Sequence, residues 1–521
     1  MKETQIKHVT RHPLLRRGLG RLFPILLWRG LGRLLLLLAI TLPTNAQPNK
    51  SKIVVLSDPH VMAPQLLVSD GTAWQNFLNN SRKLEDCSRE LFDELMTRIA
   101  DDIKPELLLI TGDMAKDGER LSHEYVVAKL DELRAKGIQT LVIPGNHDRG
   151  ANDNAVYYDG DNTTPAEVCT DQTFATLYAQ YGYGDSSERD PLSLSYACEP
   201  IRGLVIIGID SGTGGSVTAA TLQWVCQQAA KAQADGKWVM AMMHHPLEPH
   251  FLEADKFINT VAVTDYENVR NQLADAGISI LFTGHFHTSD ILKDYNADIT
   301  KEIYDISTGS LASFPCDYRI LTLDWKNSQL DIETAHISEL PGHDRSNLFA
   351  CQSKSSNLFA CQSKNFAAKA EQRLKASIKN AIASQGGAYS YVAEDAAKAY
   401  IEHAKGNEHE SAEAQSILST LLGYASLAKM LHLLDDAKIK QLENMAHSML
   451  EDLSNYGDAE RENRTNDLTL TISLPENKLV TAIATVKGAT APGDVNPRRY
   501  TLGGILLKNK PHTKGIIIIK I

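Results

Sequence analysis

Asp, Asn and His side chains follow five apolar segments of the chain, at the points where buried β-strands would end. These residue types bind divalent metal ions and transfer protons near neutral pH. Three of the five ends also contain Gly, which allows a sharp turn and a close approach to a ligand. Two of the ends carry pairs spaced two apart, so in an extended strand both side chains of a pair would point to the same side. The ten residues are Asp58, His60, Asp113, Asn146, His147, Asp148, His244, His245, His285 and His287.

The number and type of these donors favour a centre with two metal ions. The two spaced pairs, the single carboxylate, the amide and one histidine of the HHP segment supply seven oxygen and nitrogen donors. Seven donors exceed what one such ion takes from protein alone, and they suit two ions about 3.5–4 Å apart that share a carboxylate. Imidazole mixed with carboxylate and amide favours Fe, Mn or Zn over Ca. The sequence therefore predicts two divalent metal ions as cofactors.

The segments that must position these donors alternate between β-type and helical patterns from about residue 52 to residue 336. Short apolar runs indicate buried strands, and apolar residues that recur every three or four positions indicate one buried helix face. Strands separated by helices predict a layered α/β domain in which helices cover both faces of a sheet. The seven predicted strands are KIVVLS, ELLLIT, QTLVIP, LVIIGI, WVMAMM, ISILFT and RILTLDW, and the helix face comprises Leu84, Cys87, Leu91, Leu95 and Ile99.

In order along the chain, the five ends read DPH, GD, GNHD, HH and GHFH. This ordered set resembles the signature of the calcineurin-like metallophosphoesterase family, DxH, GD, GNHD, H and GHxH, over about residues 52–340. The resemblance implies a four-layer α/β-β/α sandwich, in which two mixed sheets pack face to face between layers of helices. It also implies hydrolysis of a phosphoester by metal-activated water.

The resemblance assigns a role to each residue. His147 would act as the acid toward the leaving oxygen or as a positive donor to the developing charge, and Asp148 would orient its imidazole. Asp113 would bridge the two ions, and His245 is the alternative to His244. Carried over by position, the first ion is held by Asp58, His60, Asp113 and His287, and the second by Asp113, Asn146, His244 and His285.

The expected substrate is a small phosphodiester or phosphomonoester, with a preference for the diester. Nucleic acid is not an expected partner, because the first 46 residues contribute +7 to the net charge of −11 and the remainder therefore carries −18. Non-specific nucleic-acid binding depends on Lys and Arg. A nuclease or phosphoprotein phosphatase of the same family is one alternative. A non-catalytic scaffold or surface-binding protein on the same fold, or a function located in a helical domain, is another.

Residues 1–46 have the order of a signal peptide: a basic region, the apolar run LLLLLAITL, and a small residue, Ala46, at the expected cleavage site. The apolar run is shorter than the roughly 20 residues that a membrane span needs. Cleavage would leave no stable membrane span and predicts an exported protein, in the periplasm, at the cell surface or secreted. An uncleaved amphipathic anchor is the alternative.

The chain after the expected catalytic domain, residues 47–345, divides into three parts. Residues 346–364 contain SNLFACQSK twice, a tandem copy that indicates a duplicated linker. Residues 365–465 are rich in Ala and Lys and predict a helical domain in which we identify no chemistry. Residues 466–521 are β-rich, and their ending resembles the C-terminal sorting tail of proteins exported by the type IX secretion machinery. A β-hairpin that closes the last domain is the alternative.

Three connections, 61–83, 149–200 and 246–264, are long enough to form lids or binding loops. The segment YDISTGSLASFPCDYRIL contains a Gly-Ser turn whose N–H groups would either bind a phosphate or lead into the next strand. Seven cysteines in an exported chain permit disulfides. Cys169 and Cys198, which flank one long loop, are the expected pair.

Overall fold

The computed structural model describes residues 49–477, apart from 151, 253, 257–259, 341–365, 385–388, 452 and 455–456, together with residues 499–500 and 506–507. The expected signal peptide, the duplicated linker and most of the β-rich tail lie outside these described residues. The chain separates into two compact units, Met1–Pro48 and Asn49–Ile521, and the described residues all belong to the second. Among the described helices, none combines the length and the apolar character needed to cross a membrane.

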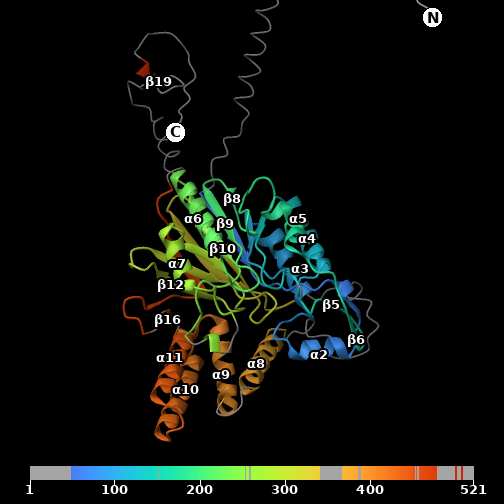
Figure 1. The fold of residues 1–521 in the computed structure, drawn as a ribbon, viewed down its shortest axis with the longest axis vertical. Helices are drawn as coiled ribbons and strands as arrows, with labels where there is room; N and C mark the ends of the chain where they lie inside the picture. Colours follow the sequence, from blue (N-terminus) through green and yellow to red (C-terminus); the bar gives the residue numbers. More distant parts are fainter. Residues whose placement is uncertain are drawn as a thin grey trace, which may run out of the picture. The chain divides into compact units, whose positions relative to one another are not determined.

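Two large β-sheets form the centre of the second unit (Figure 1). In the first sheet the order is β18-β15-β14-β1-β3-β4, and in the second it is β12-β13-β11-β10-β9-β8-β7. All seven strands predicted from the sequence are present. The first sheet comprises β1 (Lys50–Leu56), β3 (Leu107–Ile110), β4 (Gln139–Val142), β14 (Asp317–Asp324), β15 (Gln329–His336) and β18 (Thr469–Ser473). The second comprises β7 (Glu188–Arg189), β8 (Tyr196–Ile201), β9 (Leu204–Ile209), β10 (Trp238–Met243), β11 (Ile280–Thr283), β12 (Asp290–Tyr295) and β13 (Glu302–Ser307).

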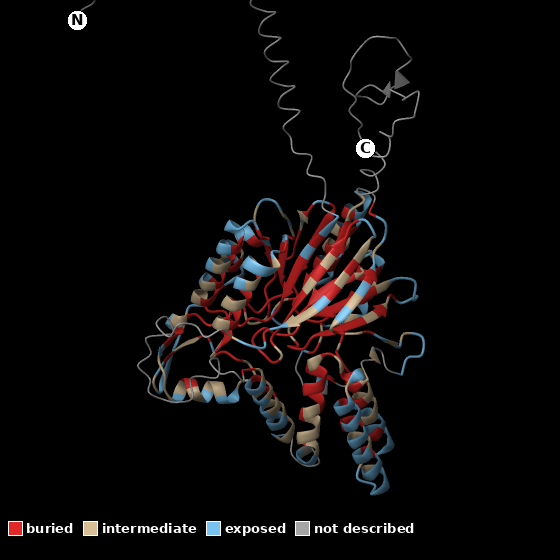
Figure 2. Ribbon diagram, turned by 180° about the vertical axis from the view of Figure 1, so that it is seen from behind, coloured by how far each residue is buried: buried red, intermediate tan, exposed pale blue. Residues whose placement is uncertain are grey.

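Helices cover the outer faces of both sheets, as the sequence predicted. Alternate residues of β9 show the arrangement: Leu204 and Ile206 join the core between the sheets, whereas Val205 and Ile207 pack in a second core. In Figure 2 most of the strand residues are coloured red for buried, and the strands at the front of the view also carry intermediate and exposed residues. The expected four-layer α/β-β/α sandwich is therefore confirmed. The covering helices are α3 (Ser88–Arg98) and α4 (Arg120–Ala135) on the first sheet and α6 (Ala219–Ala234) and α7 (Tyr266–Asp275) on the second.

The predicted helix face is buried, but the helix itself is shorter than the pattern suggested. Leu84 and Cys87 are buried ahead of α3, and Ile99 opens a π-helical turn, Ile99–Ile103. The remaining short elements lie in the connections. They are β2 (Leu67–Ser69), β5 (Val156–Asp159) and β6 (Asn162–Pro165), which form a small sheet, with α2 (Thr72–Asn80), α5 (Asp171–Leu177), the 3-10 turns Pro64–Leu66, Ala179–Tyr181 and Ala254–Lys256, and the strand pairs β16 (Leu453–Ser454) with β17 (Asn463–Arg464) and β19 (Arg499–Tyr500) with β20 (Leu506–Leu507).

The expected disulfide between Cys169 and Cys198 is wrong. Both are free thiols, whereas Cys87 is disulfide-bonded. Cys169 lies just before α5, where its backbone N–H donates to Gly118, while Cys198 belongs to β8 of the second sheet. The sequence could not reveal this separation, because the loop between the two cysteines carries them to different layers. Burial raises the pKa of both thiols to about 12, which keeps them protonated and unreactive.

The predicted C-terminal helical region is present and packs against the expected catalytic domain. Arg373 pairs with Asp86 through two hydrogen bonds of 2.6 and 3.1 Å, and the Tyr400 hydroxyl lies 3.4 Å from the backbone oxygen of Phe286. The helices are α8 (Phe366–Ser384), α9 (Tyr389–Lys405), α10 (Ala412–Met430) and α11 (Asp436–Leu450), with a 3-10 turn at Glu408–Glu410.

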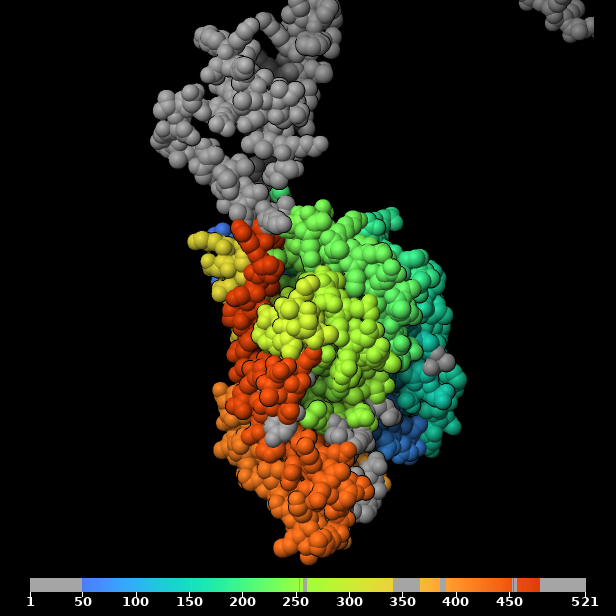
Figure 3. Space-filling view, turned by 60° about the vertical axis from the view of Figure 1, so that its left-hand side comes forward, coloured from blue at the N-terminus to red at the C-terminus, as the bar shows by residue number. Residues whose placement is uncertain are grey.

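After these helices the chain returns to the first sheet. β18 pairs antiparallel with β15, from Gln329 opposite Ser473 to Glu333 opposite Thr469. Figure 3 shows this red segment running up from the orange helices beside the yellow part of the chain. The backbone oxygen of Pro475 then accepts a 2.6 Å hydrogen bond from the Trp238 indole. The segment that we expected to open the β-rich tail therefore completes the sheet of the expected catalytic domain.

Asp305 of β13 holds the connection that follows β10. Its carboxylate accepts hydrogen bonds from the backbone N–H groups of Leu247 and Glu248 at 2.6 and 3.2 Å and from the Thr283 hydroxyl at 2.6 Å. Complete burial nevertheless raises the pKa of Asp305 to about 6, because the desolvation of the charged form outweighs these bonds. Between pH 3.8 and about 6 the folded protein thus binds a proton that the unfolded chain has lost.

This shift predicts a pH-dependent effect of Asp305→Asn. Stability that comes from a raised carboxyl pKa is lost as the pH rises through the folded-state pKa. Between about pH 4 and about pH 7, the free energy of unfolding of the wild type should therefore fall by about 3 kcal/mol relative to that of the variant. The measurement is urea unfolding of both proteins at about pH 4 and about pH 7. Other carboxylates are common to both proteins and cancel in the difference. A stability difference that stays constant across this range would contradict the prediction.

Candidate metal centre and active site

The ten residues singled out from the sequence gather at the carboxyl ends of strands from both sheets. β1, β3 and β4 pair parallel in the first sheet, and β10 and β11 pair parallel in the second. Parallel strands present their carboxyl ends at one edge, so the turns that follow these five strands meet there. Two groups of side chains that could hold a metal ion result, and Asp113 belongs to both.

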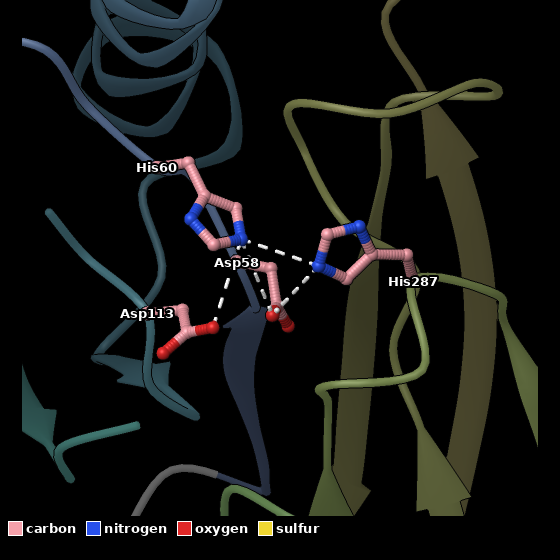
Figure 4. A group of neighbouring side chains, drawn as sticks. All are labelled: Asp58, His60, Asp113 and His287. Carbon is pink, nitrogen blue, oxygen red and sulfur yellow. Dashed lines mark hydrogen bonds and ion pairs between the residues drawn. The ribbon is translucent and has the colours of Figure 1, made fainter. Parts of the chain in front are cut away.

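The first group contains Asp58, His60, Asp113 and His287, all buried (Figure 4). The Nε2 atoms of His60 and His287 face each other at 3.2 Å, and Nε2 of His287 is also 3.2 Å from Oδ1 of Asp58. Nε2 of His60 is 3.7 Å from Oδ2 of Asp113. Four donor atoms that converge in this way match the ligand set of an Fe, Mn or Zn ion.

The second group contains Asp113, His244 and His285, and Asn146 joins it. Oδ1 of Asn146 lies 3.0 Å from Nε2 of His244 and 2.8 Å from Nδ1 of His285. Nε2 of His244 is in turn 3.4 Å from Oδ2 of Asp113. The alternative histidine, His245, stays outside the group, because its Nδ1 is paired with the Ser211 hydroxyl at 2.8 Å.

The backbone at five of the seven candidate ligands is left-handed, a conformation that costs a non-glycine residue about 1–3 kcal/mol. We expected extended strands to aim the paired side chains, but β1 ends at Leu56 and β11 at Thr283, before the ligands begin. Tight turns therefore direct these side chains, and strain of this kind is characteristic of functional sites. The residues and their φ values are Asp58 at 50°, His60 at 42°, Asp113 at 51°, His285 at 67° and His287 at 70°.

Two motif glycines make room for the carboxylates. A methyl group on Gly145 would collide with Oδ1 of Asp113, and one on Gly284 would collide with the Ser57 hydroxyl and approach Oδ2 of Asp58 to 2.6 Å. The glycines of the GNHD and GHFH motifs thus allow the two sheets to bring their ligands together.

The electrostatics of the site fit a bound cation. Oδ1 of Asp58 is buried and has no hydrogen-bond partner within the described part of the chain. Burial opposes ionisation of both carboxyls, but His287 beside Asp58 and His244 beside Asp113 hold their pKa values below the usual range. Two ionised carboxylates in a buried site require compensating positive charge, which a metal ion would provide.

The histidines are also suited to metal binding. Burial lowers the pKa of His60 well below its usual range, that of His287 to about 4 and that of His285 to about 3, so these imidazoles are neutral at pH 7. Burial acts the same way on His244, but Asp113 raises its pKa to about 9. Metal binding must therefore displace a proton from His244.

His147 is held by a different carboxylate from the one we predicted. Its Nδ1 lies 2.8 Å from Oδ1 of Asp117, whereas the oxygens of Asp148 accept backbone N–H groups of Ala115 and Gly145 at 3.0 and 2.8 Å. The predicted contact between Asp148 and His147 is therefore wrong within the described residues. Asp148, which is completely buried, instead fixes the turn that carries Asn146 and His147.

Asp117 is well suited to orient an imidazole. Burial alone would raise its pKa, but the hydrogen bond from His147 and the charge of Lys116 hold the pKa below the usual range. The backbone N–H of His147 also donates to Oδ1 of Asp113 at 2.7 Å. His147 is thus fixed through both its ring and its backbone. Asp117 follows Asp113 by four residues, and its position in the same loop was the available signal.

Other contacts that sequence reasoning missed orient the ligands from behind. Nδ1 of His244 lies 2.9 Å from the backbone oxygen of Thr111, and Nδ1 of His287 lies 3.3 Å from the Ser313 hydroxyl. Such partners fix the tautomer and the ring orientation of a metal ligand. Ser313 belongs to the segment with the Gly-Ser turn. Leu311 and Ala312 of that segment donate their N–H groups to the backbone oxygens of Ser57 and Asp58, in the turn after β1, so these amides support the site and do not face a phosphate.

A cavity of about 720 Å³ opens over the two groups. Asp113, His147, His285 and His287 reach it from below, and Arg82 and Lys83 supply positive charge at its wall. Nζ of Lys83 lies 3.3 Å from Nδ1 of His60. Two of the three long connections build the walls, with Phe77 from 61–83 and Tyr158 from 149–200, and α8 adds Ser377. The third connection, 246–264, lines a separate cavity. The aromatic Tyr158 packs edge-on against Trp74, a structural contact.

Residues 51–289 match the sequence model of the family described as calcineurin-like phosphoesterase. No curated protein matches the chain. Solved structures that are similar include a purple acid phosphatase from yellow lupin (Lupinus luteus), with 11% identity and a TM-score of 0.36, covering 57% of this chain and 53% of that one. The chain thus spans about half the length of that enzyme.

Two further structures are similar. One is a dimetal phosphatase from Danio rerio, with 11% identity and a TM-score of 0.38, covering 55% of this chain and 95% of that chain. The other is the NAD nucleotidase of Haemophilus influenzae, with 10% identity and a TM-score of 0.28, covering 52% and 47%. The family match covers every signature motif from DPH to GHFH and stops two residues past His287. Over residues 51–289, this chain therefore matches the calcineurin-like phosphoesterase family.

Proposed function

We propose that the protein is an exported phosphoesterase that uses two divalent metal ions, Fe, Mn or Zn, and prefers small phosphodiesters to phosphomonoesters. One observation carries the proposal. Asp113 belongs to both groups of metal-ligating side chains and also accepts a hydrogen bond from the backbone of His147. A single carboxylate would thus contact both expected ions and also position the expected acid.

Two bound ions would supply deprotonated water and neutralise charge on the phosphoryl oxygens. The chain's own groups do the rest. Asp117 holds Nδ1 of His147, which leaves Nε2 to donate a proton to the leaving oxygen. Arg82 and Lys83 at the cavity wall attract the anionic substrate and hold it over the two groups.

The size of the cavity supports the preference for a diester. Its volume of about 720 Å³ exceeds what a phosphate group fills, so a second ester substituent has room. Phe77 offers that substituent an apolar contact, and Asn154 and Thr163 offer polar ones.

The test is hydrolysis of an aryl phosphodiester and of the matching phosphomonoester by the full chain, with added Mn²⁺ and with a chelator. We expect activity that requires metal and a higher kcat/KM for the diester. Faster cleavage of the monoester would reverse the proposed preference while leaving the reaction class intact. If two ions bind but neither substrate is hydrolysed, the enzyme would be specific for a substrate that differs from these aryl esters. If the chain neither binds metal nor hydrolyses either substrate, the scaffold alternative remains.

Export is a separate part of the proposal, supported by the basic and apolar order of residues 1–46. N-terminal sequencing of protein recovered from outside the cytoplasm should begin at Gln47. A chain that begins at Met1 and sediments with membranes would favour the uncleaved anchor. Dependence of surface delivery on residues 478–521 would support a role for the type IX secretion machinery.

A further inference from the structure

A third group of metal-ligating side chains lies outside the catalytic centre, where the helical region meets the phosphoesterase domain. It consists of His250 in the connection between β10 and α7, Asp290 at the start of β12, and His403 in α9. One ligand atom of each lies within 4.8 Å of the other two. All three residues are buried, with at most 4% of their surface exposed. Three segments far apart in the sequence thus converge on one point.

The histidines of this group carry buried nitrogens that the described residues do not satisfy. Both ring nitrogens of His250 and Nε2 of His403 have no hydrogen-bond partner in the described part of the chain. Nδ1 of His250 does lie 3.2 Å from Oδ2 of Asp290, but outside hydrogen-bond geometry. Buried polar atoms in folded proteins are nearly always paired, so three such nitrogens in one place point to a bound partner.

His403 has the second contact that a metal-binding histidine requires. Its Nδ1 lies 2.5 Å from Oε1 of Glu408, a residue that is 1% exposed. A carboxylate on one ring nitrogen fixes the tautomer and makes the opposite nitrogen a better ligand. Nε2 of His403 is that opposite nitrogen, and it is the atom left without a partner.

Among the described residues, several buried carboxyl groups surround a single buried guanidinium near this group. The guanidinium of Arg319 is fully buried and is influenced electrostatically by four carboxyl groups. It donates to the backbone oxygen of Asp290 at 3.3 Å. A cation bound beside these carboxyl groups would be stabilised by their charge. The four carboxyl groups belong to Asp290, Asp305, Asp317 and Asp467.

We propose that His250, Asp290 and His403 bind a Zn²⁺ ion that fastens α9 to the phosphoesterase domain. Two imidazoles and one carboxylate are a zinc ligand set, whereas Ca²⁺ and Mg²⁺ take oxygen ligands. Three protein ligands leave the fourth position of a tetrahedral ion to solvent. A cavity of about 460 Å³, lined by His250, Tyr266 and Ser448 among others, adjoins the group on the side of His250.

The site would also support the catalytic centre. Phe286 stands between the candidate ligands His285 and His287, and its ring stacks on His250 at 4.1 Å with an angle of 26°. The backbone oxygen of Phe286 faces the Tyr400 hydroxyl of α9. An ion on His250 therefore holds the GHFH turn from behind through one aromatic contact.

The experiment counts zinc ions per chain by mass spectrometry after loading the metal-free full chain and removing unbound metal. It is done in the Asp113→Asn background, in which the catalytic centre loses its shared ligand. We expect His250→Phe, which keeps the stack on Phe286, and His403→Ala each to bind one ion fewer than the parent. Glu408→Gln should keep the site and weaken its affinity about 10–100-fold, as measured with a competing chelator.

His447→Ala is the matched control, because His447 is a half-buried helical-region histidine with a carboxylate partner, Glu451, at 2.8 Å. It should leave the zinc count unchanged. The melting temperature of the parent should rise on adding Zn²⁺, and this rise should be lost in His250→Phe. Equal zinc counts and equal zinc-induced shifts in parent and His250→Phe would overturn the proposal. That result would leave the catalytic centre unaffected, since the compared ions are not bound there.

Discussion

Replacing Asp113 with asparagine is expected to lower phosphoester hydrolysis by about a thousandfold or more. The variant keeps the size of the side chain but removes the charge that both metal groups share. Loss of metal-based charge stabilisation is worth several kcal/mol, and each 1.4 kcal/mol corresponds to about tenfold in rate. The measurement is kcat/KM for the aryl phosphodiester, together with the number of bound ions per chain.

Asp317→Asn is the control for Asp113→Asn. Asp317 is also a buried carboxyl, it accepts a 2.7 Å hydrogen bond from Ser289, and it belongs to neither catalytic group. We expect it to retain activity within a few-fold and to bind the same number of ions at the catalytic centre. Full activity in Asp113→Asn, or an equal loss in both variants, would show that a shared carboxylate is not what organises the centre.

His147→Ala is expected to lower the rate about 10²–10⁴-fold, the usual contribution of a general acid, while the bound metal remains unchanged. The imidazole is absent from both metal-ligating groups, so its removal leaves their donors in place. The loss should be larger for a diester with a poor alkoxide leaving group than for one with an aryl leaving group, because a good leaving group needs less protonation. Rates on both substrates, compared at equal metal content, test this expectation.

Two asparagine variants separate the roles of the neighbouring carboxylates. Asp117→Asn should reduce activity in the folded protein, since Asp117 contacts the ring of His147, and should also lower the free energy of unfolding, since Asp117 pairs with the buried Lys116. Asp148→Asn should mainly destabilise the fold, because both of its oxygens accept buried backbone N–H groups. If Asp148→Asn lost activity at unchanged stability while Asp117→Asn stayed active, Asp148 would be the residue that orients His147, as predicted from the sequence. An undiminished rate in His147→Ala would remove the general acid from the proposal altogether.

The predictable part of this protein is the part encoded locally. Apolar runs such as LVIIGI and WVMAMM form strands because each is buried on both faces, and their residues alternate between two cores. The ligands could be found because each directly follows such a strand. Gly145 and Gly284 were readable signals as well, since close approach of a carboxylate excludes any larger side chain.

The parts that could not be predicted depend on conformation or on contacts between distant segments. Left-handed turns at Asp58 and His287 carry no sequence mark of their own, because such residues normally avoid positive φ. The contact of Ser313 with His287 depends on how the two sheets are aligned with each other, which the sequence does not show. Cys169 and Cys198 are close in sequence but are carried to different layers, so loop length misled the pairing.

The group formed by His250, Asp290 and His403 shows the same limit most clearly. None of the three follows a recognisable motif, and His403 lies in a region where the sequence showed no chemistry. Their meeting depends on how α9 packs against the loop after β10. Sequence patterns report neighbours within a few residues, whereas this packing joins residues of separate regions.

The return of β18 to the first sheet determines when the protein can finish folding. Until residues 469–473 have left the ribosome, β15 has an unpaired edge, and open edges of this kind invite pairing with other chains. Contacts between segments so distant in sequence also form slowly. The sheet that supplies β1 and β3 to the metal centre is therefore completed only after the whole helical region has been synthesised. The edge of β15 therefore stays open until the helical region and β18 have both been synthesised.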